Sequence, residues 1–195
     1  MTTATQITLF RIFLIPVFIG LAIYYGQSVV AGAADESLRW WAVAVFAIAS
    51  ISDAVDGYIA RHFNQRSRLG EILDPLADKA LLLSGIITLS FTHWRQQFPL
   101  WFPLVVIFRD IAAMGGVAVV QYVTGGKCDI HTHWTGKWAT FCQMAAVLWV
   151  MLDITTPSLL WPTVLAAVLT VVSGVIYLVD GIRQTQQSGH AVAKP

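Results

Sequence analysis

The chain has 195 residues, of which 56% are hydrophobic and only 12% are charged, and its formal net charge is +1. An ordinary soluble domain has about a quarter charged residues, so this composition argues against a soluble globule. The near-neutral charge argues against a nucleic-acid partner, and the hydrophobic content excludes a disordered chain. We therefore expect an all-α, polytopic membrane protein that forms a single domain over residues 1–195.

Six apolar stretches are long enough to cross a bilayer, which takes roughly 20 mostly apolar residues. They run over Ile7–Tyr25, Trp40–Arg61, Gly70–Phe91, Leu100–Tyr122, Gly136–Leu152 and Leu159–Val179. The sequence thus predicts six transmembrane helices in one bundle. The more polar segment from Thr2 to Arg11 could lie in the membrane interface before the first span begins.

The positions of lysine and arginine between these stretches predict the orientation of the chain. In a six-span arrangement one side, which also holds both termini, carries Arg61, Arg66, Arg68, Lys127, Lys137, Arg183 and Lys194. The opposite side offers Arg39 and Arg95, with acidic residues beside the former. This bias predicts that both termini lie in the cytoplasm. The expected location is a bacterial-type inner (cytoplasmic) membrane.

Nine of the 23 charged residues fall between Asp53 and Lys79, and four of them are aspartates within or at the ends of apolar helices. Asp53 and Asp56 are three residues apart, and Asp74 and Asp78 are four apart. Each pair therefore shares one helix face. Since a short loop joins the second and third spans, the two helices should pack antiparallel and bring the four carboxylates together.

A charge in the hydrocarbon region costs at least ~2.5–3.5 kcal/mol, so these carboxylates must face each other, water or a cation. Four converging carboxylates are typical of a site for a hard divalent cation such as Mg²⁺. Two other interpretations stay open. The aspartates could form structural ion pairs with Arg61, Arg66 and Lys79, or they could mark the path of an ion or proton carrier.

Read in order, the cluster is Asp53-x2-Asp56-Gly57-x2-Ala60-Arg61-x8-Gly70-x3-Asp74-x3-Asp78. This pattern resembles the signature of the CDP-alcohol phosphatidyltransferases at every position. The resemblance extends to Thr8-Leu9-Phe10-Arg11 near the start, to Leu73-Asp74-Pro75-Leu76-Ala77-Asp78-Lys79, to Arg109-Asp110 and to Gly136-Lys137. These segments are similar to the phosphatidylglycerophosphate synthase and cardiolipin synthase branches.

The resemblance implies a six-helix membrane enzyme, often a homodimer, that transfers the phosphatidyl group of CDP-diacylglycerol to an alcohol acceptor and releases CMP. It implies two Mg²⁺ or Mn²⁺ ions at Asp53, Asp56, Asp74 and Asp78, with Asp78 as the general base and the active site facing the cytoplasm. The CDP group would contact Asp53, Asp56, Gly57, Ala60, Arg61 and Gly70. A membrane prenyltransferase also uses aspartates and Mg²⁺, but its motifs lie on widely separated helices.

Two cations, Arg109 and Lys137, could bind the phosphate of an acceptor such as glycerol 3-phosphate. Arg109 could instead pair with Asp110 or with a motif aspartate, and Lys137 could be a helix-end lysine that extends toward the membrane interface. Phosphatidylglycerophosphate synthases that resemble this chain tend to carry a further arginine and lysine where this chain has Val117 and Ala139. That difference favours a lipid acceptor, phosphatidylglycerol, with cardiolipin as the product. The overall pattern is commoner among the glycerophosphate enzymes, so glycerol 3-phosphate is the first hypothesis and phosphatidylglycerol the alternative.

Overall fold

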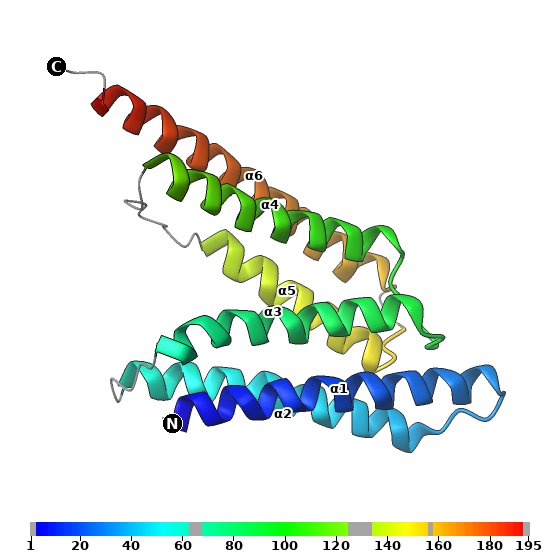
Figure 1. Cartoon of the computed structure of the whole chain (residues 1–195). Helices are drawn as coiled ribbons and strands as arrows, with labels where there is room; N and C mark the ends of the chain where they lie inside the picture. Colours follow the sequence, from blue (N-terminus) through cyan, green and yellow to red (C-terminus); the bar gives the residue numbers. More distant parts are fainter. Residues whose placement is uncertain (1–2, 63–67, 125–133, 156–157, 193–195) are drawn as a thin grey trace. The chain divides into compact units, whose positions relative to one another are not determined.

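The computed structural model describes residues 3–62, 68–124, 134–155 and 158–192. Within these ranges, the side chains of 3–5, 53–62, 68–72, 75, 117–124 and 182–192 lie outside the description. The described chain forms six helices and contains no strand (Figure 1). The all-helical prediction is therefore confirmed for this part of the molecule.

The six helices follow the six predicted stretches in the same order. They are α1 (Thr3–Val30), α2 (Glu36–His62), α3 (Arg68–Phe91), α4 (Trp101–Thr124), α5 (Trp134–Met151) and α6 (Leu160–Val192). The segment predicted to lie in the interface is, from Thr3 onward, a continuous part of α1. The helices α1 and α6 also extend several residues beyond the apolar runs from which they were predicted.

Local hydrogen bonding explains where α1 ends. The N–H of Gly32 donates to the carbonyl of Val29, and the N–H of Ala33 donates to the carbonyl of Ser28. Gly32 has a φ of 76°, a left-handed conformation that glycine adopts without steric cost. These bonds form a Schellman motif, so the glycine rather than the loss of hydrophobicity ends the helix.

The described contacts divide the chain into two compact units. Unit 1 comprises Met1–Pro99 and Val147–Leu159, and unit 2 comprises Leu100–Ala146 and Leu160–Pro195. The prediction of a single domain over the whole chain stays a prediction.

In unit 1, α1 packs against both α2 and α3. The rings of Phe18 and Phe46 lie 5.3 Å apart between α1 and α2. The indole N–H of Trp94, which follows α3, donates to the carbonyl of Ala22 in α1 over 3.0 Å. Because α1 has partners on two sides, it can present different side chains to α2 and to α3.

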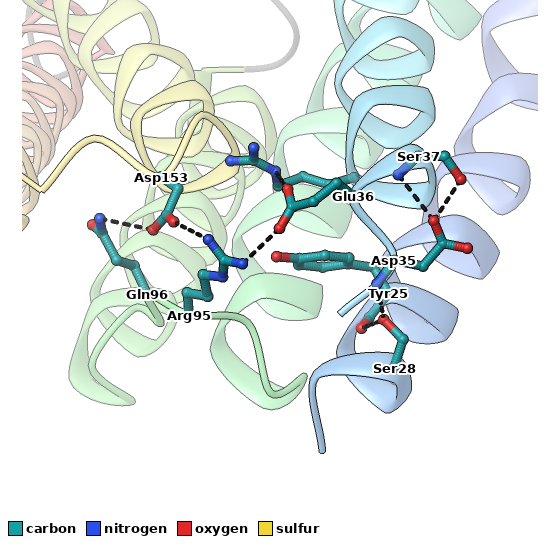
Figure 2. Close-up of polar contacts among 9 residues, drawn as sticks. Tyr25, Ser28, Asp35, Glu36, Ser37, Arg95, Gln96 and Asp153 are labelled. Atoms are coloured by element: carbon teal, nitrogen blue, oxygen red, sulfur yellow. Dashed lines mark hydrogen bonds and ion pairs between the residues drawn. The ribbon is translucent and has the colours of Figure 1, made fainter. Parts of the chain in front are cut away.

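Ion pairs join the helix ends of unit 1 near the last turns of α1 (Figure 2). Arg95 bridges Glu36, at the start of α2, and Asp153, just after α5, over 2.7 and 3.3 Å. Gln96 donates to the same Asp153 carboxylate (Figure 2). Because the start of α2 and the segments that follow α3 and α5 meet in this network, it fixes the end of unit 1 that lies away from Thr8 and Arg11.

In unit 2, α4 packs against α6. The amide of Gln143 in α5 donates to the hydroxyl of Thr170 in α6 over 2.6 Å, and both side chains are buried. A buried polar pair of this kind is satisfied internally and fixes the register of two apolar helices.

Two helices in the described part are long and apolar enough to cross a membrane. They are Gln6–Val30 and Leu160–Gly181, each with a mean hydropathy of 2.2. Large apolar side chains are exposed on other helices too, including Ile51, Phe108, Met114 and Phe141. The two apolar helices agree with a membrane protein, while the arrangement with six spans stays a prediction.

Candidate active site

The side chains of two of the four motif aspartates are described, and both lie on α3. Asp74 and Asp78 are four residues apart, which places them about 40° apart around the helix axis. Both side chains are partly exposed. As the spacing predicted, the two carboxylates share one face of a helix.

That face meets α1, where Thr8 and Arg11 contact the two carboxylates. The hydroxyl of Thr8 donates to Oδ1 of Asp74 over 2.6 Å. The guanidinium of Arg11 donates through Nη1 to Oδ1 of Asp78, also over 2.6 Å. Both donors are fully buried, so α1 holds each carboxylate with a side chain that is itself fixed by packing.

The Arg11–Asp78 pair is asymmetric in its exposure to solvent. The Arg11 side chain is 0% exposed, whereas the Asp78 side chain is 43% exposed. A buried guanidinium needs an anionic partner, because an uncompensated buried charge costs several kcal/mol. Asp78 supplies that charge, although much of its own side chain is exposed to solvent.

Thr8 and Arg11 were not among the predicted site residues. Both were noted only as part of the segment Thr8–Arg11 that resembles the family. One signal in the sequence could have identified them, since a threonine and an arginine three residues apart share a face of an otherwise apolar helix. An ionisable residue in such a helix normally has a polar partner, and the aspartates were available.

The remaining predicted motif residues lie on described backbone, but their side chains are outside the description. Asp53, Asp56, Gly57, Ala60 and Arg61 belong to α2, and Gly70 belongs to α3. The helix α2 packs against α1 and contacts α3. Three helices of one unit thus carry the motif residues and the two donors that hold them.

The chemistry of Asp74 and Asp78 fits a hard divalent cation. A carboxylate has about four acceptor positions, so the single bond from Thr8 to Asp74 leaves capacity for a cation. No group of three or more histidine, cysteine or acidic side chains that could hold a metal occurs among the described side chains. The predicted four-aspartate site depends on Asp53 and Asp56 and stays a prediction.

The two cations predicted to bind an acceptor both belong to unit 2. Arg109 in α4 donates to the carboxylate of Asp110 over 2.9 Å and to the hydroxyl of Ser173 in α6 over 2.7 Å. Its guanidinium carbon lies 5.5 Å from the centre of the Tyr177 ring. The structural alternative considered for Arg109, pairing with Asp110, is therefore realised, together with two contacts that the sequence did not predict.

Lys137 lies in the first turn of α5, directly after Gly136. Its side chain is exposed, with the ammonium 6.0 Å from the ring of Trp134. Ala139, which stands where related enzymes tend to have a lysine, is fully buried. The exposed Lys137 side chain remains available for a ligand, while position 139 supplies packing.

The family model for CDP-alcohol phosphatidyltransferases matches residues 1–181. The chain belongs to this family. The match includes all six helix starts, the four motif aspartates, Thr8 and Arg11, and the cluster around Arg109. The enzyme class predicted from the motif is therefore confirmed.

Named relatives within the family fall into two groups. A probable phosphatidylglycerophosphate synthase of Mycobacterium tuberculosis is 34% identical over 93% of this chain and 85% of its own length. A CDP-diacylglycerol–glycerol-3-phosphate 3-phosphatidyltransferase of Haemophilus influenzae is 30% identical over 88% of this chain and 89% of its own. A CMP-forming cardiolipin synthase of Streptomyces coelicolor is 38% identical, but over 54% of this chain and 47% of its own length.

Proposed function

We propose that this enzyme transfers the phosphatidyl group of CDP-diacylglycerol to glycerol 3-phosphate, forming phosphatidylglycerophosphate and CMP. The observation that carries the proposal is the extent of the similarity. Relatives named as phosphatidylglycerophosphate synthase or for the glycerol 3-phosphate reaction match along 73–93% of the chain, while the cardiolipin synthase matches along 54%. The longer matches include the segments around Arg109 and Lys137 as well as the aspartate motif.

In the proposed reaction, the acceptor hydroxyl oxygen forms a bond to the β-phosphorus of the CDP-lipid. The bond from that phosphorus to the oxygen of CMP breaks, and CMP leaves with the electron pair. The proton of the hydroxyl passes to the carboxylate of Asp78, which Arg11 holds in place. A hydroxyl is a weak acid, so it needs a carboxylate in hydrogen-bonding reach as its charge develops.

We assign Asp53, Asp56, Asp74 and Asp78 to the binding of two Mg²⁺ or Mn²⁺ ions. Bound ions would neutralise the diphosphate and the charge that develops on it. The protein's own contribution at Asp74 is orientation, since the hydroxyl of Thr8 fixes Oδ1. Gly57, Ala60, Arg61 and Gly70, together with Asp53 and Asp56, are the proposed contacts of the CDP group.

The proposed setting is the bacterial-type inner membrane, with six spans and the active site facing the cytoplasm. Two apolar helices and the apolar exposure of others support it. A homodimer surrounded by membrane lipids is part of the proposal. Glycosylated or cysteine-labelled loop variants in membrane vesicles would test the orientation.

A CMP-release assay on the purified enzyme in detergent tests the proposed acceptor. We expect turnover of CDP-diacylglycerol with glycerol 3-phosphate and a divalent cation, and little with phosphatidylglycerol. The variant Asp78→Asn should lose turnover, and because it also removes the carboxylate that balances the buried guanidinium of Arg11, its folding is checked separately by circular dichroism. Release of CMP with phosphatidylglycerol alone would instead assign the enzyme to the cardiolipin reaction.

That alternative rests on Val117 and Ala139, which replace the further arginine and lysine of the similar synthases, and the Ala139 side chain is buried. A dianionic acceptor calls for more positive charge than a lipid phosphodiester, and neither position supplies any. The remote alternative, an ion or proton carrier, predicts flux across liposomes that Asp53→Asn abolishes, without any release of CMP.

A further inference from the structure

The side chain of Arg109 is enclosed by three elements of unit 2. Ser173 and Tyr177 are four residues apart in α6 and therefore share the face that meets α4. The hydroxyl of Ser173 accepts from Nη2 of Arg109, while the Tyr177 ring lies beside the guanidinium carbon. One face of α6 thus contributes both a hydrogen bond and an aromatic contact to a single guanidinium.

Two glycines make room for this side chain. A β-carbon added at Gly174 would lie 3.1 Å from Cγ of Arg109. One added at Gly136, in the first turn of α5, would lie 3.3 Å from Nη2 of Arg109 and 3.2 Å from the hydroxyl of Tyr177. All three distances are tighter than ordinary contacts, so the side chain follows a narrow path that permits little choice of rotamer.

The guanidinium keeps unused donor capacity in this arrangement. It has five N–H groups, and Asp110 and Ser173 accept from one each. The Nε atom is buried and has no hydrogen-bond partner within the described part of the chain. A fixed guanidinium with spare donors beside the N-terminal turn of a helix favours an anion, because the helix end also attracts negative charge.

We infer that Ser173 and Tyr177 are positioning residues that hold Arg109 for the anionic group of the acceptor. The inference rests on the proposed function, in which Arg109 binds that group. Asp110 and Ser173 fix the plane of the guanidinium, and Tyr177 restricts its rotation. An acceptor phosphate then meets guanidinium N–H groups that are already oriented for it. Binding therefore does not incur the entropy cost of ordering the arginine side chain.

Steady-state kinetics of four variants test this role. We expect Ser173→Ala and Tyr177→Leu to raise the KM for the acceptor about three- to tenfold, while kcat and the KM for CDP-diacylglycerol change less than about twofold. Ser173→Thr keeps the hydroxyl and should restore most of the affinity. Tyr177→Phe keeps the ring and should retain more affinity than Tyr177→Leu.

Ser90→Ala is a matched control, because this buried serine in α3 donates only to the backbone carbonyl of Ile86 among the described contacts. It should leave both KM values unchanged. An unchanged acceptor KM in Ser173→Ala and Tyr177→Leu would overturn the inference. A similar rise in the KM values of both substrates together with a fall in kcat would also overturn it, because such a result indicates general damage to the enzyme.

The acceptor used by the wild-type enzyme separates this inference from the proposed function. If the wild type uses phosphatidylglycerol and not glycerol 3-phosphate, the proposed function is wrong. The same series is then measured with phosphatidylglycerol, whose phosphodiester is also anionic. A selective rise in its KM would support the positioning role, and no rise would refute it.

Discussion

The buried guanidinium of Arg11 lies 2.6 Å from Oδ1 of Asp78, although 67 residues separate the two in the chain. This pair, with the parallel contact between Thr8 and Asp74, makes α1 a structural support of the aspartate motif. Residues that orient the ligands of a metal site typically contribute about 10- to 100-fold to activity or metal affinity, and we expect a similar contribution from residues that orient these carboxylates.

Replacing Arg11 by Met keeps much of the side-chain volume and removes the charge. We expect CMP release to fall about 10- to 100-fold, because the Asp78 carboxylate loses the donor that orients it. Arg11→Lys should be intermediate, since an ammonium keeps the charge but not the planar fork. Arg39→Met, which removes the ion pair with Glu36 in the same unit, should retain most activity. Equal activity of Arg11→Met and wild type would contradict the role of Arg11.

Replacing Thr8 by Val removes a hydroxyl from Asp74 at nearly constant shape. We expect the divalent cation concentration for half-maximal activity to rise about tenfold, with a smaller change at saturating metal. Thr8→Ser should behave like the wild type. The control is Thr92→Val, which deletes a hydroxyl that donates to the Thr88 carbonyl at the far end of α3. A metal requirement that is identical in Thr8→Val and wild type would show that Thr8 only packs.

Asp35 caps the start of α2 and should make stability depend on acid pH. The hydroxyl of Ser37 and, with a smaller effect, the backbone N–H of Ser37 donate to the carboxylate of Asp35. Both bonds lower the pKa of Asp35 below its ordinary value of 3.8. The charged form is therefore favoured in the folded state. Its stabilising effect is complete above the ordinary pKa and is lost as the pH falls through the lower folded value.

Melting temperatures measured between pH 2.5 and pH 6, a range chosen to bracket about pH 4, would test this expectation. Asp35→Asn should keep the cap and flatten this part of the pH dependence. Asp35→Ala should lower the melting temperature throughout. If Asp35→Asn reproduced the full acid-induced decrease of the wild type, the effect would come from other carboxylates.

Asp153 adopts a φ of 55° just after α5, a left-handed conformation that is unfavourable for most residues. The N–H of Asp153 and that of Ile154 donate to carbonyls of the last helical turns, as in a Schellman motif. We expect Asp153→Asn to be tolerated, since asparagine accepts this conformation. Asp153→Val should lower the free energy of unfolding by about 1–3 kcal/mol.

Thermal unfolding in detergent would measure both changes. Asp153→Gly relieves the backbone conformation but removes the partner of Arg95, so it separates the two contributions. If Asp153→Val were as stable as Asp153→Asn, the left-handed conformation would not limit stability at this position.

The six helices could be predicted from the sequence because each contains an apolar run of its own. The end of α1 could not, since it depends on Gly32 and on hydrogen bonds that form only in the folded turn. The shared face of Asp74 and Asp78 followed from helix geometry. Their partners Thr8 and Arg11 did not, because which faces of α1 and α3 meet is decided by packing between distant segments.

The cluster around Arg109 shows the same division. Its pairing with Asp110 was foreseen as an alternative because the two are adjacent in the chain. Ser173 lies 64 residues away from Arg109, and no local pattern marks it or Tyr177 among the many residues of α6. The sequence does not mark the two glycines beside the arginine either, because their role is to leave space for the Arg109 side chain, and this space is apparent only in the folded structure.

The two contacts between α1 and α3 also couple the site to the motion of a whole helix. Thr8 and Arg11 are about one turn apart, as are Asp74 and Asp78, so an axial slip of α1 by one turn, about 5.4 Å, would break both bonds together. A ligand that needs both carboxylates in place therefore also stabilises the register of α1. Binding at the aspartates should slow amide hydrogen exchange along α1, including turns that no substrate touches.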